Sequence, residues 1–158
     1  MSRLHTYAVC FAVSLSAVAE LAAANPQAMA PAAPRQLTQA DALSLVRSTL
    51  MSVHDANFSG NYTVLKDLGS PAFQRRSANE LSALFAPLRD RNLDLFAAAS
   101  APSSWSQPPA IEAGNRLHLR GSFATRPHAV VFDFTFEPID GVWKHAKLTI
   151  GLKPVASQ

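Results

Sequence analysis

Few residues of this chain could do acid–base or ligand-binding chemistry, and three of them lie close together. His54, Asp55 and Tyr62 fall where a predicted first helix ends and a second begins. An imidazole, a carboxylate and a phenol at such a junction could move a proton or orient a polar group of a ligand. The competing interpretation is that His54 and Asp55 are solvated or help to close the helix end. We expect these residues to be the polar candidates at the mouth of a pocket.

Residue spacing gives little support to metal or cofactor chemistry. The histidines outside the N-terminal leader show neither an i, i+4 pair nor the HExxH pattern of zinc enzymes, so no metal site is predicted. His118 and His145 could lie on adjacent strands, but two solvated sheet residues are the favoured interpretation. No glycine-rich phosphate-binding motif occurs, so we predict no nucleotide and no other cofactor.

The charge balance argues against nucleic acid as a partner. The chain has 14 Lys and Arg against 11 Asp and Glu, a net charge of +3. A nucleic-acid interface needs a clustered basic face with interleaved aromatic residues, whereas Arg75–Arg76 is the only adjacent basic pair. Cys10 is the single cysteine and lies in the leader, so we expect neither a disulfide nor a thiolate metal site in the domain.

The N-terminal segment has the order of a secretory signal peptide. Arg3 and His5 precede an apolar run over residues 8–19, which Glu20 and a stretch of small residues close. We expect cleavage after Ala24, with a second possible site after Ala30. The run is shorter than the roughly 20 residues that span a bilayer, so no stable membrane anchor is predicted. A buried N-terminal helix is the alternative, but the proline-rich residues 25–36 would separate it from the domain. The sequence thus predicts a secreted or periplasmic bacterial protein.

The chain is predicted to contain one folded domain. A signal peptide over residues 1–24 and a disordered leader over residues 25–36 precede a domain over residues 37–154, and residues 155–158 form a tail. Thr38 and Asp41 resemble a capping box at the start of a helix. This helix is expected to run to about Asn57, and Gly60 is expected to end it. The apolar face of this helix is predicted to contain Leu43, Val46, Leu50 and Val53.

Shorter helices are expected after Gly60. One surrounds Tyr62, Leu65 and Leu68 and ends at Gly69, and Ser70 before Pro71 is typical of a further helix start. Ser77 and Glu80 form the clearest capping box of the chain. The helix they begin is predicted to bury Leu81, Leu84, Phe85 and Leu88, with Pro87 kinking or shortening it.

Alternating apolar residues predict an antiparallel sheet in the second half. A loop over residues 97–109 that carries Trp105 is expected first, and then strands around residues 117–123 and 130–136. Asp140–Gly141 is typical of a hairpin turn, and the period of the last strand slips near Lys144, as a β-bulge would cause. The inward face is predicted to contain Leu117, Leu119, Phe123, Val130, Phe132, Phe134, Phe136, Val142, Ala146, Leu148, Ile150 and Leu152. The fold class is therefore α+β, with N-terminal helices packed on one face of a curved antiparallel sheet.

Several of these residues together resemble a known superfamily. They are Tyr62-x-x-Leu65, Phe73-Gln74, Glu80-Leu81 and Phe85 in the helical half, then Leu117-x-Leu119-x-Gly121 and Trp143-Lys144 in the strands. The set spans about Leu37–Pro154 and resembles a secreted member of the NTF2-like superfamily, whose fold is a cystatin-like α+β cone. That superfamily contains ketosteroid isomerase and scytalone dehydratase, but also transport factors and exported domains that are not known to catalyse anything. No local motif here matches the isomerases or dehydratases, so no catalytic residue is carried over.

The predicted lining of the cone favours binding over catalysis. No ionisable group lies on its inward strand face, whereas proton transfer needs a group with a tuned pKa. We therefore predict a non-catalytic module that binds a small apolar ligand or a protein partner, and keep an isomerase- or hydratase-type enzyme as the alternative. The ligand-pocket candidates are His54, Asp55, Tyr62, Phe123, Phe132, Phe134 and Phe136.

The outward sheet face supplies candidates for an interface. Tryptophan and arginine are enriched in interface hot spots, and the resemblance implies dimerisation through this face. We therefore expect a homodimer that uses Arg120, Asp133, Trp143 and His145. The competing interpretation is that Trp143 belongs to the core and reaches it through the bulge.

Overall fold

Helix α1 (Gln39–Ser59) begins and ends at the residues that signal it in the sequence. The Thr38 hydroxyl accepts a hydrogen bond from the Asp41 backbone N–H, and the Asp41 carboxylate accepts one from the Thr38 backbone N–H, which confirms the predicted capping box. Gly60 ends the helix at a φ of 71°, a left-handed conformation that glycine adopts readily. The computed structural model describes residues 37–155, so the predicted signal peptide, the leader and residues 156–158 lie outside the described residues.

Four shorter helices follow α1 within the described residues 37–155. They are α2 (Thr63–Asp67), α3 (Pro71–Gln74), α4 (Ala78–Asp90) and α5 (Leu95–Ser100). The Ser70 cap of α3 and the Ser77–Glu80 capping box of α4 are both confirmed. Helix α4 continues past Pro87 to Asp90. Of its predicted buried residues, Leu84 is wrong, because 43% of this residue is exposed.

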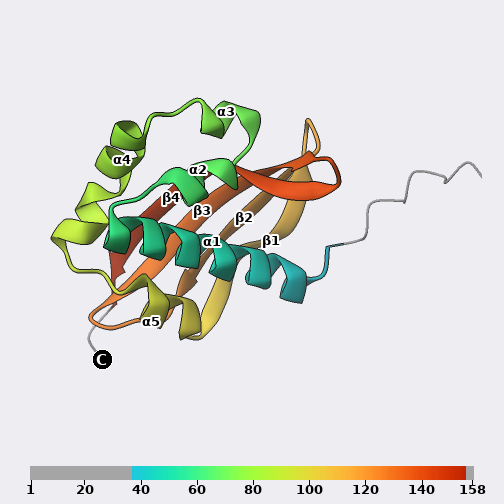
Figure 1. Ribbon diagram of the computed structural model, residues 1–158. Coiled ribbons are helices and arrows are strands. Elements are labelled where there is room, and N and C mark those ends of the chain that lie inside the picture. The colour runs from blue at the N-terminus through green and yellow to red at the C-terminus, as the bar shows by residue number, and fades with distance from the viewer. Residues whose placement is uncertain (1–36, 156–158) are drawn as a thin grey trace, which may run out of the picture. The chain divides into compact units, whose positions relative to one another are not determined.

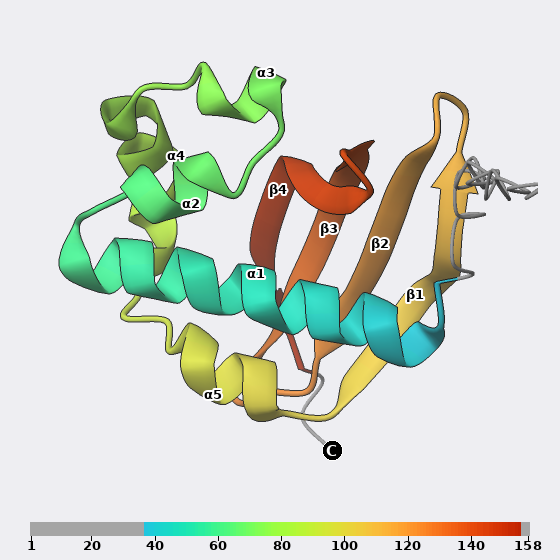
Figure 2. The same cartoon turned by 45° about the vertical axis from the view of Figure 1, so that its right-hand side comes forward.

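The strands form one antiparallel sheet in the order β1-β2-β3-β4. They are β1 (Ser103–Glu112), β2 (Arg116–Phe123), β3 (His128–Ile139) and β4 (Val142–Pro154). The helices lie on one face of this curved sheet, with α1 running across the strands and α5 beside it (Figure 1 and Figure 2). The predicted α+β fold class is confirmed.

The core lies between α1 and the inward face of the sheet. Val46, Leu50 and Val53 of α1 are fully buried, and so is Phe134 of β3. Phe134 pairs with Leu119 on β2 and with Leu148 on β4, which places it in the middle of the sheet. The rings of Phe132, Phe134 and Phe136 contact one another in turn along β3, with centroids 5.6 and 6.4 Å apart. The predicted inward face of β3 is confirmed.

Residues 97–109 are not the predicted loop, because they form most of α5 and of strand β1. β1 is an edge strand, where the missing N–H groups of Pro108 and Pro109 are tolerated, and its pairing with β2 is irregular between Gln107 and Ala110. Trp105 lies opposite Gly121 and packs edge-on against Phe132, with ring centroids 5.8 Å apart. The Trp105 side chain thus belongs to the sheet's inward packing.

Strand β4 contains the predicted bulge, but at a different residue. Thr135 pairs with Lys147 and Phe136 pairs with His145, so Ala146 is the extra residue. Because side chains alternate along a strand, this displacement puts Trp143 and His145 on the inward face and turns Val142 outward. The prediction that Val142 faces inward is wrong, since 57% of it is exposed. Among residues 37–155, no helix is long and apolar enough to cross a membrane.

Candidate functional site

A small pocket lies between α1 and the β3–β4 hairpin, and we refer to it as the α1–β4 pocket. Its volume is about 220 Å³. Helix α1 supplies one wall, Phe136 and the start of β4 supply the other, and Leu68 comes from the segment after α2. The lining residues are Leu45, Ser48, Thr49, Ser52, Leu68, Phe136, Val142, Trp143, Lys144 and His145.

The segment between α2 and α3 fixes the position of His145. The Ser70 backbone N–H donates a hydrogen bond of 2.8 Å to the His145 carbonyl, and Gly69 forms a parallel bridge with the same residue. A Cβ on Gly69 would lie 2.6 Å from the Phe73 ring, so only glycine permits this approach. Phe73 in turn packs edge-on against the imidazole, with ring centroids 4.4 Å apart.

His145 is an ionisable residue that is buried on the inward face of the sheet, although the sequence pattern predicted it on the outward face. Only 4% of it is exposed. Burial lowers the pKa of His145 from 6.5 to about 4; a hydrogen bond to the Leu65 backbone opposes this shift, and the charge of Lys144 reinforces it. The imidazole is therefore neutral near pH 7. The predictions that His145 is an outward interface residue and that no ionisable group lies inward are both wrong, because the bulge lies at Ala146.

The Nε2 atom of His145 is buried and has no hydrogen-bond partner among the described residues. The Leu65 contact raises the pKa, as a carbonyl acceptor does, and we infer that the N–H of the neutral ring is on Nδ1 and points to this carbonyl. A neutral imidazole carries one N–H, so Nε2 is left with a lone pair. The ring thus presents a hydrogen-bond acceptor without a partner, on a residue that lines the pocket.

Three hydroxyl groups of α1 face the same pocket. Ser48 and Thr49 donate to the Leu45 carbonyl at 3.1 and 2.8 Å, and Ser52 donates to the Ser48 carbonyl at 3.0 Å. Each proton is therefore used within the helix, while each oxygen keeps lone pairs. These residues were not predicted from the sequence, although hydroxyl groups beside the apolar stripe of α1 are a signal that could have indicated them.

Trp143 is half-buried and packs against the core, so its predicted place on the outward face is wrong. Its indole forms part of the apolar side of the α1–β4 pocket, together with Phe136 and Leu68. The competing interpretation, in which Trp143 reaches the core through the bulge, is the one that the structure supports.

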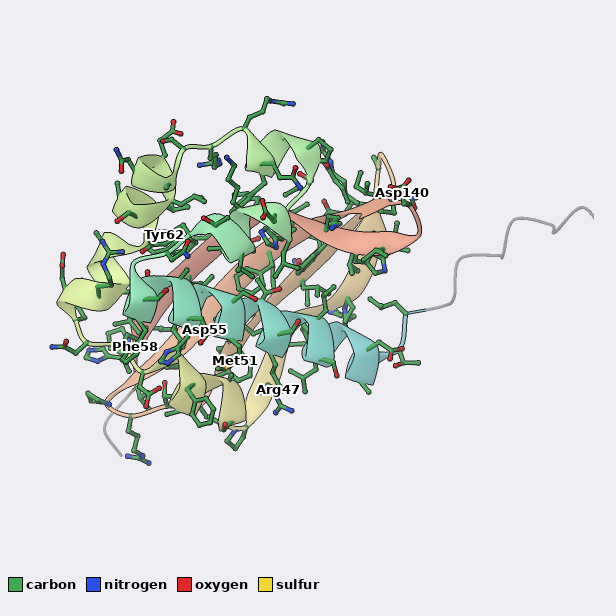
Figure 3. All side chains as sticks on the ribbon, in the orientation of Figure 1. Arg47, Met51, Asp55, Phe58, Tyr62 and Asp140 are labelled. Carbon is green, nitrogen blue, oxygen red and sulfur yellow. The ribbon has the colours of Figure 1, made fainter. Side chains whose placement is uncertain are left out.

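The three polar candidates at the end of α1 are not brought into this pocket. Tyr62 is buried, and its hydroxyl donates a 2.7 Å hydrogen bond to Asn57 and accepts one from Arg89. His54, Asn57 and Arg89 border a different hollow of about 280 Å³. Asp55 is exposed along α1, whereas Tyr62 lies beyond the end of that helix (Figure 3).

The aromatic candidates divide between core and pocket. Phe123 and Phe134 are completely buried. Phe132 packs between Trp105 and Phe123, and it approaches Gly121 so closely that a Cβ there would lie 2.6 Å from its ring. Phe136 is the member of the set that lines the α1–β4 pocket.

The outward sheet face carries a network of charged side chains. Asp133 accepts hydrogen bonds from His118 at 2.7 Å and from Arg120 at 3.1 Å, while the other ring nitrogen of His118 lies 2.7 Å from Glu112. Burial raises the pKa of Asp133, but the His118 hydrogen bond and the Arg120 charge outweigh it and hold the pKa below 3.8. Arg120 and Asp133 thus face outward as predicted. The homodimer stays a prediction, now without Trp143 and His145.

Within residues 37–155, no group of three or more His, Cys, Asp or Glu side chains could hold a metal ion. Comparison with protein-family models, with curated proteins and with solved structures finds no match to this chain. The NTF2-like resemblance therefore stays a prediction, and the site has to be interpreted from its own geometry.

Proposed function

We propose that this chain is an exported, non-catalytic binding module, and that its ligand is a small, largely apolar molecule with one hydrogen-bond donor. The ligand binds in the α1–β4 pocket. The observation that carries this proposal is His145, which lines the pocket and whose buried Nε2 has no partner among the described residues.

The unpartnered nitrogen favours a donor group on the ligand. Leaving a buried acceptor without a hydrogen bond costs about 1–3 kcal/mol. Nε2 is enclosed in the structure, so the side chains around it must move slightly to admit a hydroxyl or N–H of the ligand, and the hydrogen bond then formed would offset this cost. The apolar body of the ligand would contact Trp143, Phe136 and Leu68, which line the same pocket.

The volume limits the ligand to about one ring. An apolar cavity of about 150 Å³ is enough to bind benzene, and pockets for drug-sized ligands start at about 300 Å³. The α1–β4 pocket has about 220 Å³. A single substituted ring, such as a phenol, fits this size and carries the required donor.

The same residue argues against acid–base catalysis. A general base works best when its pKa is near the operating pH, whereas burial holds the pKa of His145 at about 4. Among the described residues that line the pocket, Lys144 is the one other ionisable residue. The site therefore suits a ligand that is held by a neutral acceptor better than a substrate that must lose a proton.

Phenol and anisole test the proposal, because they share the ring and only phenol has a donor. The quenching of Trp143 fluorescence reports binding if Trp105, the other tryptophan of the chain, is replaced by Phe. We expect phenol to bind several-fold more tightly than anisole, and His145→Leu to abolish this difference. His128→Leu changes an exposed histidine at the start of β3 and is the matched control.

Two results would contradict the proposal. Equal affinities for phenol and anisole in the unmodified chain would reject Nε2 as the acceptor. Retention of the phenol preference in His145→Leu would place the donor contact elsewhere. Circular dichroism of each variant establishes that lost binding is not lost folding.

A further inference from the structure

A second and larger pocket lies at the other end of the sheet, and we refer to it as the α5 pocket. The connection between α4 and α5 forms one wall, and the connection between β2 and β3 forms the other. Its volume is about 890 Å³, within the range of about 300–1,000 Å³ typical of small-molecule sites. The lining residues are Arg91, Asn92, Leu93, Asp94, Ala97, Thr125, Arg126, Pro127, His128 and Leu152.

This pocket is separate from the α1–β4 pocket. Strand β3 runs from His128, which lines the α5 pocket, to Ile139, next to the hairpin that borders the α1–β4 pocket. Figure 2 shows α5 at one end of the strands and the β3–β4 hairpin at the other. The two pockets share no lining residue.

The charge of the α5 pocket is unbalanced. Arg91 and Arg126 come from opposite walls, and neither guanidinium makes an ion pair or a hydrogen bond to another described residue. Asp94, the one carboxylate among the described residues of the lining, accepts a 2.9 Å hydrogen bond from the Ala97 backbone N–H as the cap of α5. Two free cations therefore face one acid that already has a partner.

The walls of the pocket are held in place by their own hydrogen bonds. Asn92 N–H donates to the Arg89 carbonyl at 2.8 Å, and Leu93 N–H donates to the Leu88 carbonyl at 3.0 Å. On the other wall, the Thr125 hydroxyl donates to the His128 carbonyl. A pocket whose backbone is already ordered needs little rearrangement to bind a ligand.

Part of the uncharged lining is apolar. Leu93 and Leu152 are partly buried and pack against the core, so they form a fixed apolar surface beside the two arginines. A guanidinium matches the geometry of a carboxylate or sulfonate through paired hydrogen bonds. The combination fits a molecule with an anionic head and an apolar body.

We propose that the α5 pocket binds a small amphiphilic anion, with Arg91 and Arg126 on the acidic head and with Leu93 and Leu152 on the apolar body. The class is that of medium-chain carboxylates. This site is independent of the α1–β4 pocket and of the phenol proposal.

Competition at the full-length chain tests this site. The fluorescent probe 8-anilinonaphthalene-1-sulfonate has the required sulfonate and apolar rings, and it is too large for the α1–β4 pocket. We expect saturable probe binding that octanoate reverses and that 1-octanol, which has no charge, reverses far less. Phenol should leave the bound probe in place.

Charge-matched variants separate a specific site from general attraction. Replacing both arginines of the pocket, Arg91→Gln with Arg126→Gln, should weaken octanoate binding roughly tenfold or more, since two charge-assisted contacts are lost. The control variant, Arg75→Gln with Arg76→Gln, removes the same charge beside α3 and should change octanoate binding less than about twofold. The variant Arg91→Lys with Arg126→Lys should bind octanoate better than the Gln variant but less tightly than the unmodified chain, because lysine keeps the charge without the paired geometry.

Three outcomes would overturn the proposal. They are the absence of saturable probe binding, equal octanoate binding by the Arg91→Gln/Arg126→Gln variant and the unmodified chain, and equal losses in the pocket variant and the Arg75/Arg76 control. Both pocket arginines are exposed, so their replacement should leave the thermal melt unchanged, and the melt is recorded for each variant.

Discussion

The burial of His145 makes the stability of the domain depend on pH. Its pKa is about 4 in the folded chain against an ordinary 6.5, so between these values an unfolded chain binds a proton that the folded chain does not. The free energy of unfolding should therefore decrease as the pH falls from about 6.5 to about 4. The shift corresponds to roughly 3 kcal/mol at most. Urea denaturation at a series of pH values measures it.

The matched variants identify the residue responsible. His145→Leu should lack this decrease, while His128→Leu should keep it. Asp133 does not account for this decrease. Its lowered pKa also stabilises the folded chain, but that contribution to the free energy of unfolding is lost only as the pH falls below about 3.8. An equal pH slope in the unmodified chain and in His145→Leu would refute the assignment.

At the level of single residues, the sequence predicted capping and burial better than the site. Thr38, Ser77 and Gly60 act locally, within one turn of the chain, so their roles could be inferred from spacing alone. The role of His145 depends on a bulge whose exact residue the alternation could not fix. A shift of the bulge from Lys144 to Ala146 was enough to move Trp143 and His145 to the other face.

Among the elements, strand β3 offers the most direct test of register. Phe134 is fully buried, whereas the side chain of its neighbour Asp133 is 36% exposed on the opposite face. Phe134→Ala should lower the free energy of unfolding by about 3–5 kcal/mol. Asp133→Ala should cost less than about 1 kcal/mol, because its ion pairs are partly solvated.

Chemical denaturation of both variants under the same conditions gives this comparison. Phe134→Leu is a useful intermediate, because it keeps an apolar side chain and should cost less than the alanine variant. A mild effect of Phe134→Ala together with a severe effect of Asp133→Ala would mean that the faces of β3 are exchanged in solution.

Strand β1 is the element that the sequence pattern predicted wrongly, as part of a loop. Its prolines and serines are typical of a loop, and no alternation of apolar residues marks it. It is nevertheless a strand, because β2 offers it a ladder of partners from Phe123 to Arg116 and because an edge position tolerates proline. The strand conformation of β1 thus depends on its pairing with β2, and the local sequence pattern of β1 does not indicate it.

For the whole domain, the order of the elements was enough to predict the fold class. Helices followed by a meander of strands can bury both apolar faces only by packing helices on one side of the sheet. The two pockets could not be predicted in this way. Each is built from segments that are far apart in the chain, such as α1 with β4, and their depth depends on how the side chains meet.

The last prediction concerns the processing of the chain. The domain's first helix is capped by Thr38, so cleavage after Ala24 would leave the cap and the fold intact. We therefore expect exported protein to begin at Asn25, which N-terminal sequencing determines. Because Cys10 is the only cysteine, the exported chain should also fail to react with a maleimide, and its thermal melt should be the same with and without reductant.

The unprocessed chain provides the control for this prediction. Chain retained in the cytoplasm, or produced there with residues 1–24 intact, should react with one maleimide at Cys10 and carry Met1. An N-terminus at Pro31 would still indicate a signal peptide, cleaved at the second site after Ala30. Exported protein that keeps Met1, or that reacts with maleimide, would show that the segment before the domain is not removed, and the proposal of an exported, cysteine-free module would fail.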